Sequence, residues 1–241
     1  MCTVVLAIRP GHAVPVLLAA NRDERVDRVW DAPGAYWTDR PGVVAGRDRT
    51  AGGTWMGMNR HGVSAAVLNR QGTLGPAAGK RSRGELPLIA LEQPSAAAAV
   101  EAIGALDAKQ WRGFNMVIAD AHGGIFLRGL GGGRPEPLPL PAGVHMVTAH
   151  EPNDPESPRV ARHLGRFRAR LPAGPTDWGA WQEILADRSG PDGTEINIAP
   201  RGGFGTVSSA LIAWPAAGIP EFLFAAGPPH TSAFSQVNFP R

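Results

Sequence analysis

One cysteine and one run of polar residues stand out as groups that could do chemistry. Cys2 is the only cysteine among the 241 residues, and a four-residue polar run directly follows the apolar run 16–20: Asn21, Arg22, Asp23 and Glu24. Charged groups are rarely buried without a partner. A polar run at the end of a buried strand is therefore either a solvated exit or a cluster that serves a site nearby.

Its place in the chain gives Cys2 a chemistry that most strand cysteines lack. Methionine aminopeptidases trim Met1 when the next side chain is small, which would leave Cys2 with a free α-amine. The thiol is then a nucleophile, and the amine, with a reference pKa of ~7.7–8.0, is a base at neutral pH. Such a site also needs donors for an oxyanion. The other interpretation is that Cys2 is a small hydrophobe of a strand.

A β-hairpin would bring the polar run to the cysteine. The apolar runs 2–9 and 14–20 are separated by the turn residues PGHA, a pattern typical of a hairpin. The second strand then returns beside the first, so we expect residues 21–24 within a few ångströms of Cys2. We also expect Arg22 to pair with a carboxylate and, with the α-amine, to lower the thiol pKa.

Composition narrows the function classes. The net charge is +3, charged residues are 19% and hydrophobic residues 43%, as in an ordinary globular protein. Basic residues are scattered apart from GKRSRGE at 79–85, so no nucleic-acid partner is expected. No apolar run has the ~18–20 residues of a membrane span, and no secretory signal is visible. We therefore expect a cytoplasmic protein, without disulfides, a metal or an obligatory cofactor.

The order of apolar patterns predicts an α+β fold of mainly antiparallel sheets covered by helices, in a single domain over residues 1–241. Residues 71–82 form a loop, and in the helix at 175–187 Thr176 is the expected N-cap. The arginine-rich face of the helix at 157–171 is expected to be solvated. The strands are expected at 2–9, 14–20, 42–48, 114–120, 124–130, 144–150, 208–215 and 219–227, and the helices at 83–93, 94–108, 157–171 and 175–187. The segment 54–70 is expected to hold two strands on either side of the turn NRHG, the second over 63–68.

Several ordered blocks resemble one known family. The blocks MCTVV, LLAANRDE, VVAGRD, AGGTWMGMNRHGVSAAVLNR, RSRGEL and GFNMVIAD are similar to the NRDE family, also called the transport-and-Golgi-organisation family. That family resembles N-terminal-nucleophile hydrolases, which implies a four-layer αββα sandwich here. A more distant likeness is to the choloylglycine hydrolase and penicillin acylase group.

The resemblance implies roles for particular residues. Cys2 would be the nucleophile, Arg22 and Asp23 its supports, and Asn69 an oxyanion donor; Asn69 as a turn-facing amide is the alternative. Ala149 and Val207 stand where relatives carry polar groups.

Further candidates come from the residues themselves. Asn115 is the one polar residue inside the apolar strand FNMVIAD, and Arg83 with Glu85 is either a substrate clamp or a helix cap, with the cap favoured. Asn21 and Glu24 complete the candidate substrate-binding set. His145 and His150 lie five apart, so on a regular strand they face opposite sides and make a poor metal pair.

Two functions remain open. The leading one is an N-terminal cysteine amidohydrolase or acyl-transfer enzyme acting on a small amide or acyl substrate. The alternative is a non-catalytic binding or trafficking protein for haem or acyl-coenzyme A, roles that the family resemblance suggests.

Overall fold

The computed structural model describes residues 2–240, which divide into two compact units. The first unit holds the chain up to residue 28 and residues 141–237, and the second holds residues 29–140 with the segment that starts at Asn238. Each unit contains one sheet whose strand pairs are antiparallel, with helices packed on it. The α+β class is thus confirmed, and the single domain over 1–241 stays a prediction.

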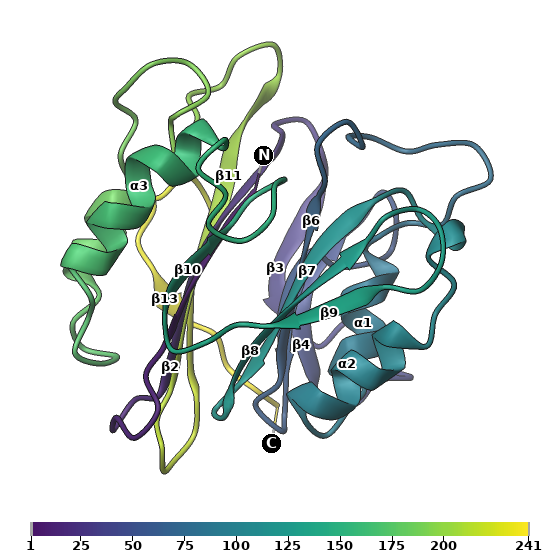
Figure 1. Ribbon diagram of the computed structural model, residues 1–241, viewed down its shortest axis with the longest axis horizontal. Helices are drawn as coiled ribbons and strands as arrows, with labels where there is room; N and C mark the ends of the chain where they lie inside the picture. Colours follow the sequence, from purple (N-terminus) through teal and green to yellow (C-terminus); the bar gives the residue numbers. More distant parts are fainter. Residues whose placement is uncertain (1, 241) are drawn as a thin grey trace. The chain divides into compact units, whose positions relative to one another are not determined.

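The first sheet carries the N-terminal hairpin at its centre (Figure 1). Its strand order is β10-β1-β2-β11-β12-β13. The predicted hairpin is confirmed: β1 pairs antiparallel with β2, and Thr3 stands opposite Asn21. The elements of this unit are β1 (Thr3–Ile8), β2 (Val16–Arg25), β10 (Gly143–Val147), β11 (Phe204–Trp214), β12 (Glu221–Ala225), β13 (Ser235–Gln236), α3 (Pro158–Ala169) and α4 (Gly179–Leu185).

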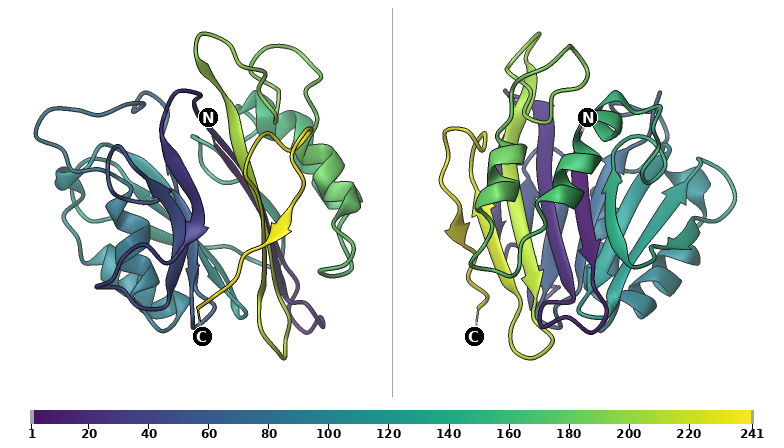
Figure 2. Two further views of the ribbon diagram at one scale, coloured as in Figure 1. Left: turned by 180° about the vertical axis from the view of Figure 1, so that it is seen from behind. Right: turned by 60° about the vertical axis from the view of Figure 1, so that its left-hand side comes forward.

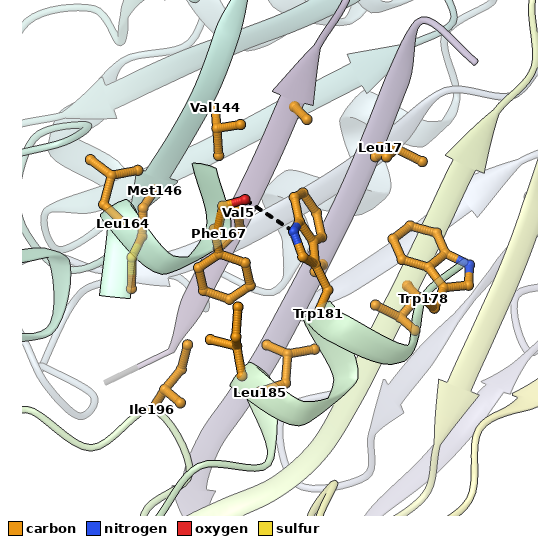
Figure 3. Close-up of a cluster of buried hydrophobic side chains, with 14 of the residues drawn as sticks. Val5, Leu17, Val144, Met146, Leu164, Phe167, Trp178, Trp181, Leu185 and Ile196 are labelled. Atoms are coloured by element: carbon orange, nitrogen blue, oxygen red, sulfur yellow. Dashed lines mark hydrogen bonds between the residues drawn. The ribbon is translucent and has the colours of Figure 1, made fainter. Parts of the chain in front are cut away.

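Helices α3 and α4 cover one face of this sheet, as the two green helices in the right-hand view of Figure 2 show. Alternate residues of β1 and β2, such as Val5 and Leu17, point into the core under these helices, as the two-residue period of a strand requires. In Figure 3, Phe167 of α3 packs edge-on against Trp181 of α4, with ring centroids 5.2 Å apart. The indole of Trp181 also donates to the carbonyl of Phe167 at 3.3 Å.

Strand β2 is longer than its apolar pattern. The sequence predicts an end at Ala20, whereas the strand continues through the polar run to Arg25. The reason is its neighbour: β11 pairs with β2 from Val16 to Arg25 and supplies hydrogen-bonding partners for buried polar side chains. The polar run therefore belongs to the sheet and is no solvated exit.

The second sheet has the order β3-β4-β5-β6-β7-β8-β9. Helices α1 and α2 share its core with alternate residues of β6 and β7, including Ala65 and Met116. The elements of this unit are β3 (Trp30–Gly34), β4 (Val43–Asp48), β5 (Met56–Asn59), β6 (Ser64–Asn69), β7 (Phe114–Asp120), β8 (Gly123–Gly129), β9 (Glu136–Pro139), α1 (Glu85–Leu91), α2 (Ala96–Gly104) and a short 3-10 helix (Ala108–Gln110).

The sequence missed short edge strands and one helix start. Strands β3, β9 and β13 lie at sheet edges and carry few alternating apolar residues. Helix α4 begins at Gly179 with Trp178 at the N-cap position, so the prediction of Thr176 as the cap is wrong. No helix within residues 2–240 is both long and apolar enough to cross a membrane.

Candidate active site

Cys2 lies directly before β1, at the edge of the polar run. Its thiol donates to the backbone carbonyl of Asp23 at 3.6 Å, which places Cys2 beside residues 21–24 as the hairpin predicts. The register that pairs Thr3 with Asn21 continues to set Cys2 opposite Arg22. Residues opposite each other on paired strands share a face. Cys2 and Arg22 therefore lie on the face opposite to helices α3 and α4.

A buried ion pair lies behind the cysteine, on the helix-covered face. Asp23 receives a hydrogen bond from Arg159 of α3 at 2.8 Å, and their side chains are 0% and 4% exposed. Arg159 also donates to the hydroxyl of Thr3 at 2.8 Å, and Thr206 of β11 donates to Asp23 at 2.6 Å. A buried carboxylate that is paired and hydrogen-bonded in this way is held in one position.

Arg159 is the functional candidate that sequence reasoning missed. We expected the arginine-rich face of the helix at 157–171 to be solvated, and for Arg159 this is wrong because Asp23 offers it a buried partner. Ser157 caps the helix by accepting from Val160, and Pro158 follows it. This start places Arg159 in the first turn, over the end of β2. Helical spacing alone carries no sign of a partner 136 residues away.

The side chain of Asn21 connects β2 to other parts of the first unit by hydrogen bonds. Its amide donates to the carbonyls of Leu185 at 2.9 Å and Ile196 at 2.8 Å, and its oxygen accepts from Ser209. Both amide N–H groups are thus used by the protein. A contact between Asn21 and a substrate would have to go through the side-chain oxygen.

Arg22 and Glu24 lie on the same face as Cys2. Arg22 is buried and its guanidinium lies 3.7 Å from the carboxylate of Glu24, so the expected pairing with a carboxylate is present. Arg28 reaches the same carboxylate at 3.9 Å. Glu24 therefore links Arg22 to Arg28.

The electrostatics of the thiol differ from the expectation. Burial raises the pKa of Cys2, the negative charge of Asp23 raises this pKa further, and the hydrogen bond to Asp23 and the charge of Arg22 lower it by less. The prediction of a lowered thiol pKa is therefore wrong for the chain as described. A thiol in this environment needs a base to act as a nucleophile at neutral pH.

Four predicted site residues lie in the second unit. Asn69 ends β6 opposite Phe114. Strand alternation puts Asn69 on the face of Ala65 and Val67, which packs under α1 and α2. Asn115 lies on the other face, is fully buried, and accepts from Arg70 at 2.5 Å. The oxyanion role of Asn69 and the binding role of Asn115 stay predictions.

Arg83 binds a loop. Its guanidinium donates to the carbonyls of Thr73 at 2.8 Å, Gly113 at 3.1 Å and Gly75 at 3.3 Å. Glu85 pairs with Arg81 at 2.5 Å. Helix α1 has no side-chain cap, so the favoured interpretation of Arg83 and Glu85 as a capping pair is wrong.

The histidines near β10 are engaged with protein atoms. His145 contacts the carbonyl of Pro141 at 2.8 Å and the amide of Asn153 at 2.9 Å, and His150 contacts Asp154 at 3.2 Å. Within residues 2–240 no three side chains of the metal-ligating types gather into a site.

Several solved structures of hydrolases are similar to this structure. The structure matches a Caenorhabditis elegans ortholog of N-acylethanolamine-hydrolyzing acid amidase, with a TM-score of 0.60 and 13% identity, over 88% of this chain and 92% of the other. It matches penicillin V acylase from Agrobacterium tumefaciens with a TM-score of 0.55 and 16% identity, over 93% and 83%. A mutant of conjugated bile acid hydrolase from Clostridium perfringens matches with a TM-score of 0.50 and 11% identity, over 100% and 97%. The predicted N-terminal-nucleophile hydrolase fold is thereby confirmed.

Sequence comparison gives the family. The chain is 29% identical over 159 residues to the Transport and Golgi organization 2 homolog of Mus musculus, which covers 61% of this chain and 56% of the relative. The chain thus spans little more than half the length of that curated relative. The family model described as Transport and Golgi organisation 2 matches residues 1–173. The chain belongs to the Transport and Golgi organisation 2 family.

Proposed function

We propose that this protein is a cytoplasmic N-terminal cysteine amidohydrolase that acts on a small acyl amide, with Cys2 as the nucleophile once Met1 has been removed. The observation that carries the proposal is the position of the thiol, 3.6 Å from the backbone of Asp23, beside a buried Asp23–Arg159 pair. The solved structures compared above are an amidase, an acylase and a hydrolase. Their activities support amide or acyl chemistry here.

The bond changes and proton transfers use the thiol and α-amine of Cys2 and one water molecule. The α-amine of Cys2 takes the thiol proton, and sulfur forms a bond to the carbonyl carbon of the amide. The carbon–nitrogen bond then breaks, and the leaving amine departs with that proton. Water hydrolyses the thioester and restores the thiol. The raised pKa keeps the thiol protonated at neutral pH. The α-amine can still activate it, because it accepts the thiol proton directly as sulfur attacks.

Asp23 and Arg22 have different parts in this proposal. Both oxygens of Asp23 accept hydrogen bonds from the protein, one from Arg159 and one from Thr206. Asp23 therefore acts as a positioning residue that fixes the end of β2 against Cys2. Arg22 lies on the face of Cys2 and favours the thiolate, because its positive charge lowers the thiol pKa.

Turnover of a panel of N-acyl amides tests the proposal, with the released acid measured by mass spectrometry and Met1 removal verified by intact mass. We expect the processed protein to hydrolyse at least one amide and Cys2→Ser to lose this activity. Ser95→Ala is the matched control, since it removes only the cap of α2 at Ala98. Stoichiometric binding of haem or acyl-coenzyme A by Cys2→Ser, with no turnover by the wild type, would instead establish the carrier function.

A further inference from the structure

Three loops of the second unit meet at one end of its sheet. They are residues 71–82 after β6, residues 105–113 around the 3-10 helix, and residues 130–135 between β8 and β9. The backbone N–H of Arg81 donates to the carbonyl of Gln110 at 2.8 Å, and that of Ala108 donates to the carbonyl of Gly133 at 2.8 Å. The middle loop thus joins the other two, and together they form what we call the three-loop surface.

Two leucines of the three-loop surface lie in water. Leu74 is 63% exposed and Leu130 is 55% exposed. They lie near each other, because a Cβ on Gly113 would be 3.1 Å from the side chain of Thr73 and 3.4 Å from the carbonyl of Gly129. Those two residues directly precede the leucines. A leucine side chain left in water contributes little to folding, and neighbouring exposed ones mark a place where an apolar partner is bound.

Unpaired positive charge surrounds these leucines. The ammonium of Lys80 donates to the carbonyl of Lys109 at 2.6 Å, and Arg112 donates to four backbone carbonyls of the loop after β6. Lys109 and Arg134 line one hollow together with the carboxylate-bearing Asp107. Within residues 2–240 none of the four cations forms an ion pair with a carboxylate. Four positive charges therefore stand against the one negative charge of Asp107.

The basic segment 79–85 is part of this surface. Its Arg81 pairs with Glu85 and adds no net charge, so Lys80 is the residue through which the segment contributes. Protein–protein interfaces are depleted of lysine, and their strongest contacts seldom come from leucine. Bilayer surfaces combine the two, because apolar side chains enter the acyl boundary while Lys and Arg meet anionic headgroups.

We propose that the three-loop surface docks the protein on a membrane that contains anionic lipids. Leu74 and Leu130 enter the boundary between headgroups and acyl chains, and Lys80, Lys109 and Arg134 contact lipid phosphates. Arg112 is a positioning residue, since its hydrogen bonds hold the loop that carries Leu74. This contact is peripheral, and it is independent of the chemistry of Cys2.

Co-sedimentation with lipid vesicles tests the proposal. One set of vesicles holds phosphatidylcholine alone, and the other holds an equal mixture of phosphatidylcholine and phosphatidylglycerol. We expect the wild type to bind the mixed vesicles at least about tenfold more tightly at about 0.05 M salt, and to lose most of this binding at about 0.5 M salt. Cys2→Ser should bind the vesicles as the wild type does.

Matched variants locate the contact. Leu74→Ser should weaken binding by about tenfold, because a buried leucine is lost from the lipid. Ile219→Ser is its control, since Ile219 is 87% exposed in the first unit, between β11 and β12. Arg134→Gln should weaken binding by about fivefold. Arg49→Gln removes the same charge from an exposed position after β4 and should have no effect. All four variants should keep the melting temperature of the wild type, because these side chains are exposed.

Three results would overturn the proposal. The first is equal binding to both kinds of vesicle, or an equal loss in Arg134→Gln and Arg49→Gln. The second is binding of a poly-glutamate peptide without binding of vesicles, which would assign the surface to an acidic protein. The third is a wild-type dimer that Leu74→Ser dissociates in sedimentation velocity, which would assign the leucines to a second copy of the chain.

Discussion

The two units use arginine in opposite ways. In the first unit Arg159 meets the carboxylate of Asp23 in a buried pair beside Cys2. In the second unit Arg83 and Arg112 donate to backbone carbonyls of the loop that follows β6, among them those of Thr73 and Leu74. A buried ion pair holds charged groups in fixed positions next to a reactive group, whereas hydrogen bonds to backbone carbonyls hold a loop in one conformation. The first arrangement suits chemistry and the second suits loop order.

Removing Arg159 should have the largest effect. Arg159→Met leaves the carboxylate of Asp23 buried without its cation, and we expect a loss of about 3–5 kcal/mol in the free energy of unfolding. Urea denaturation measures this loss. The double variant Asp23→Leu with Arg159→Met removes both charges and should recover much of the stability while remaining inactive. If Arg159→Met costs less than Arg83→Met, the contrast between the two units is wrong.

Acid should weaken the first unit through His163. Burial lowers the pKa of His163 from 6.5 to about 4, and the nearby charges of Arg166 and Arg162 contribute. A histidine with a lowered folded pKa stabilises the fold above its unfolded pKa, and this contribution is lost as the pH falls from about 6.5 through about 4. The loss amounts to roughly 3 kcal/mol at most. Denaturant titration across this range should show the fall, and His163→Gln should flatten it. An equal slope in both proteins contradicts the assignment.

Freeing the loop should have the smallest effect on stability. Arg83→Met and Arg112→Met each remove hydrogen bonds to the carbonyls of residues 72–76, so we expect faster proteolysis there and a change of about 1 kcal/mol in unfolding free energy. Arg81→Met is the control, because Arg81 pairs with Gln110 and Glu85 instead. Equal cleavage rates in all three variants would show that the carbonyl contacts do not hold the loop.

The sequence predicted what local patterns encode. Hairpin geometry placed residues 21–24 beside Cys2, and turn residues with two-residue alternation located the long central strands. Sequence patterns failed to predict the environment of a side chain whose partners lie far away in the chain. Asp23 is buried because Arg159 and Thr206 reach it from elements more than 130 residues away. Likewise Thr206 faces Asp23 because of a bulge at Val207 that appears only when β11 pairs with β2.

The pKa of the Cys2 thiol is a second property that the sequence did not predict. Arg22 beside Cys2 was foreseen and does lower the thiol pKa, yet burial and the charge of Asp23 outweigh it. Net pKa shifts depend on desolvation, which a sequence pattern does not contain.

The most direct measurement is the site of acylation during turnover. Protein with and without Met1 is mixed with an N-acyl amide that the processed protein hydrolyses. The reaction is quenched in acid within the first turnovers, and the site of acylation is mapped by peptide mass spectrometry. We expect one acyl group on the sulfur of Cys2, only in chains that have lost Met1, and none in Cys2→Ser. Product formation with no adduct on Cys2, or equal turnover by chains that retain Met1, would contradict it.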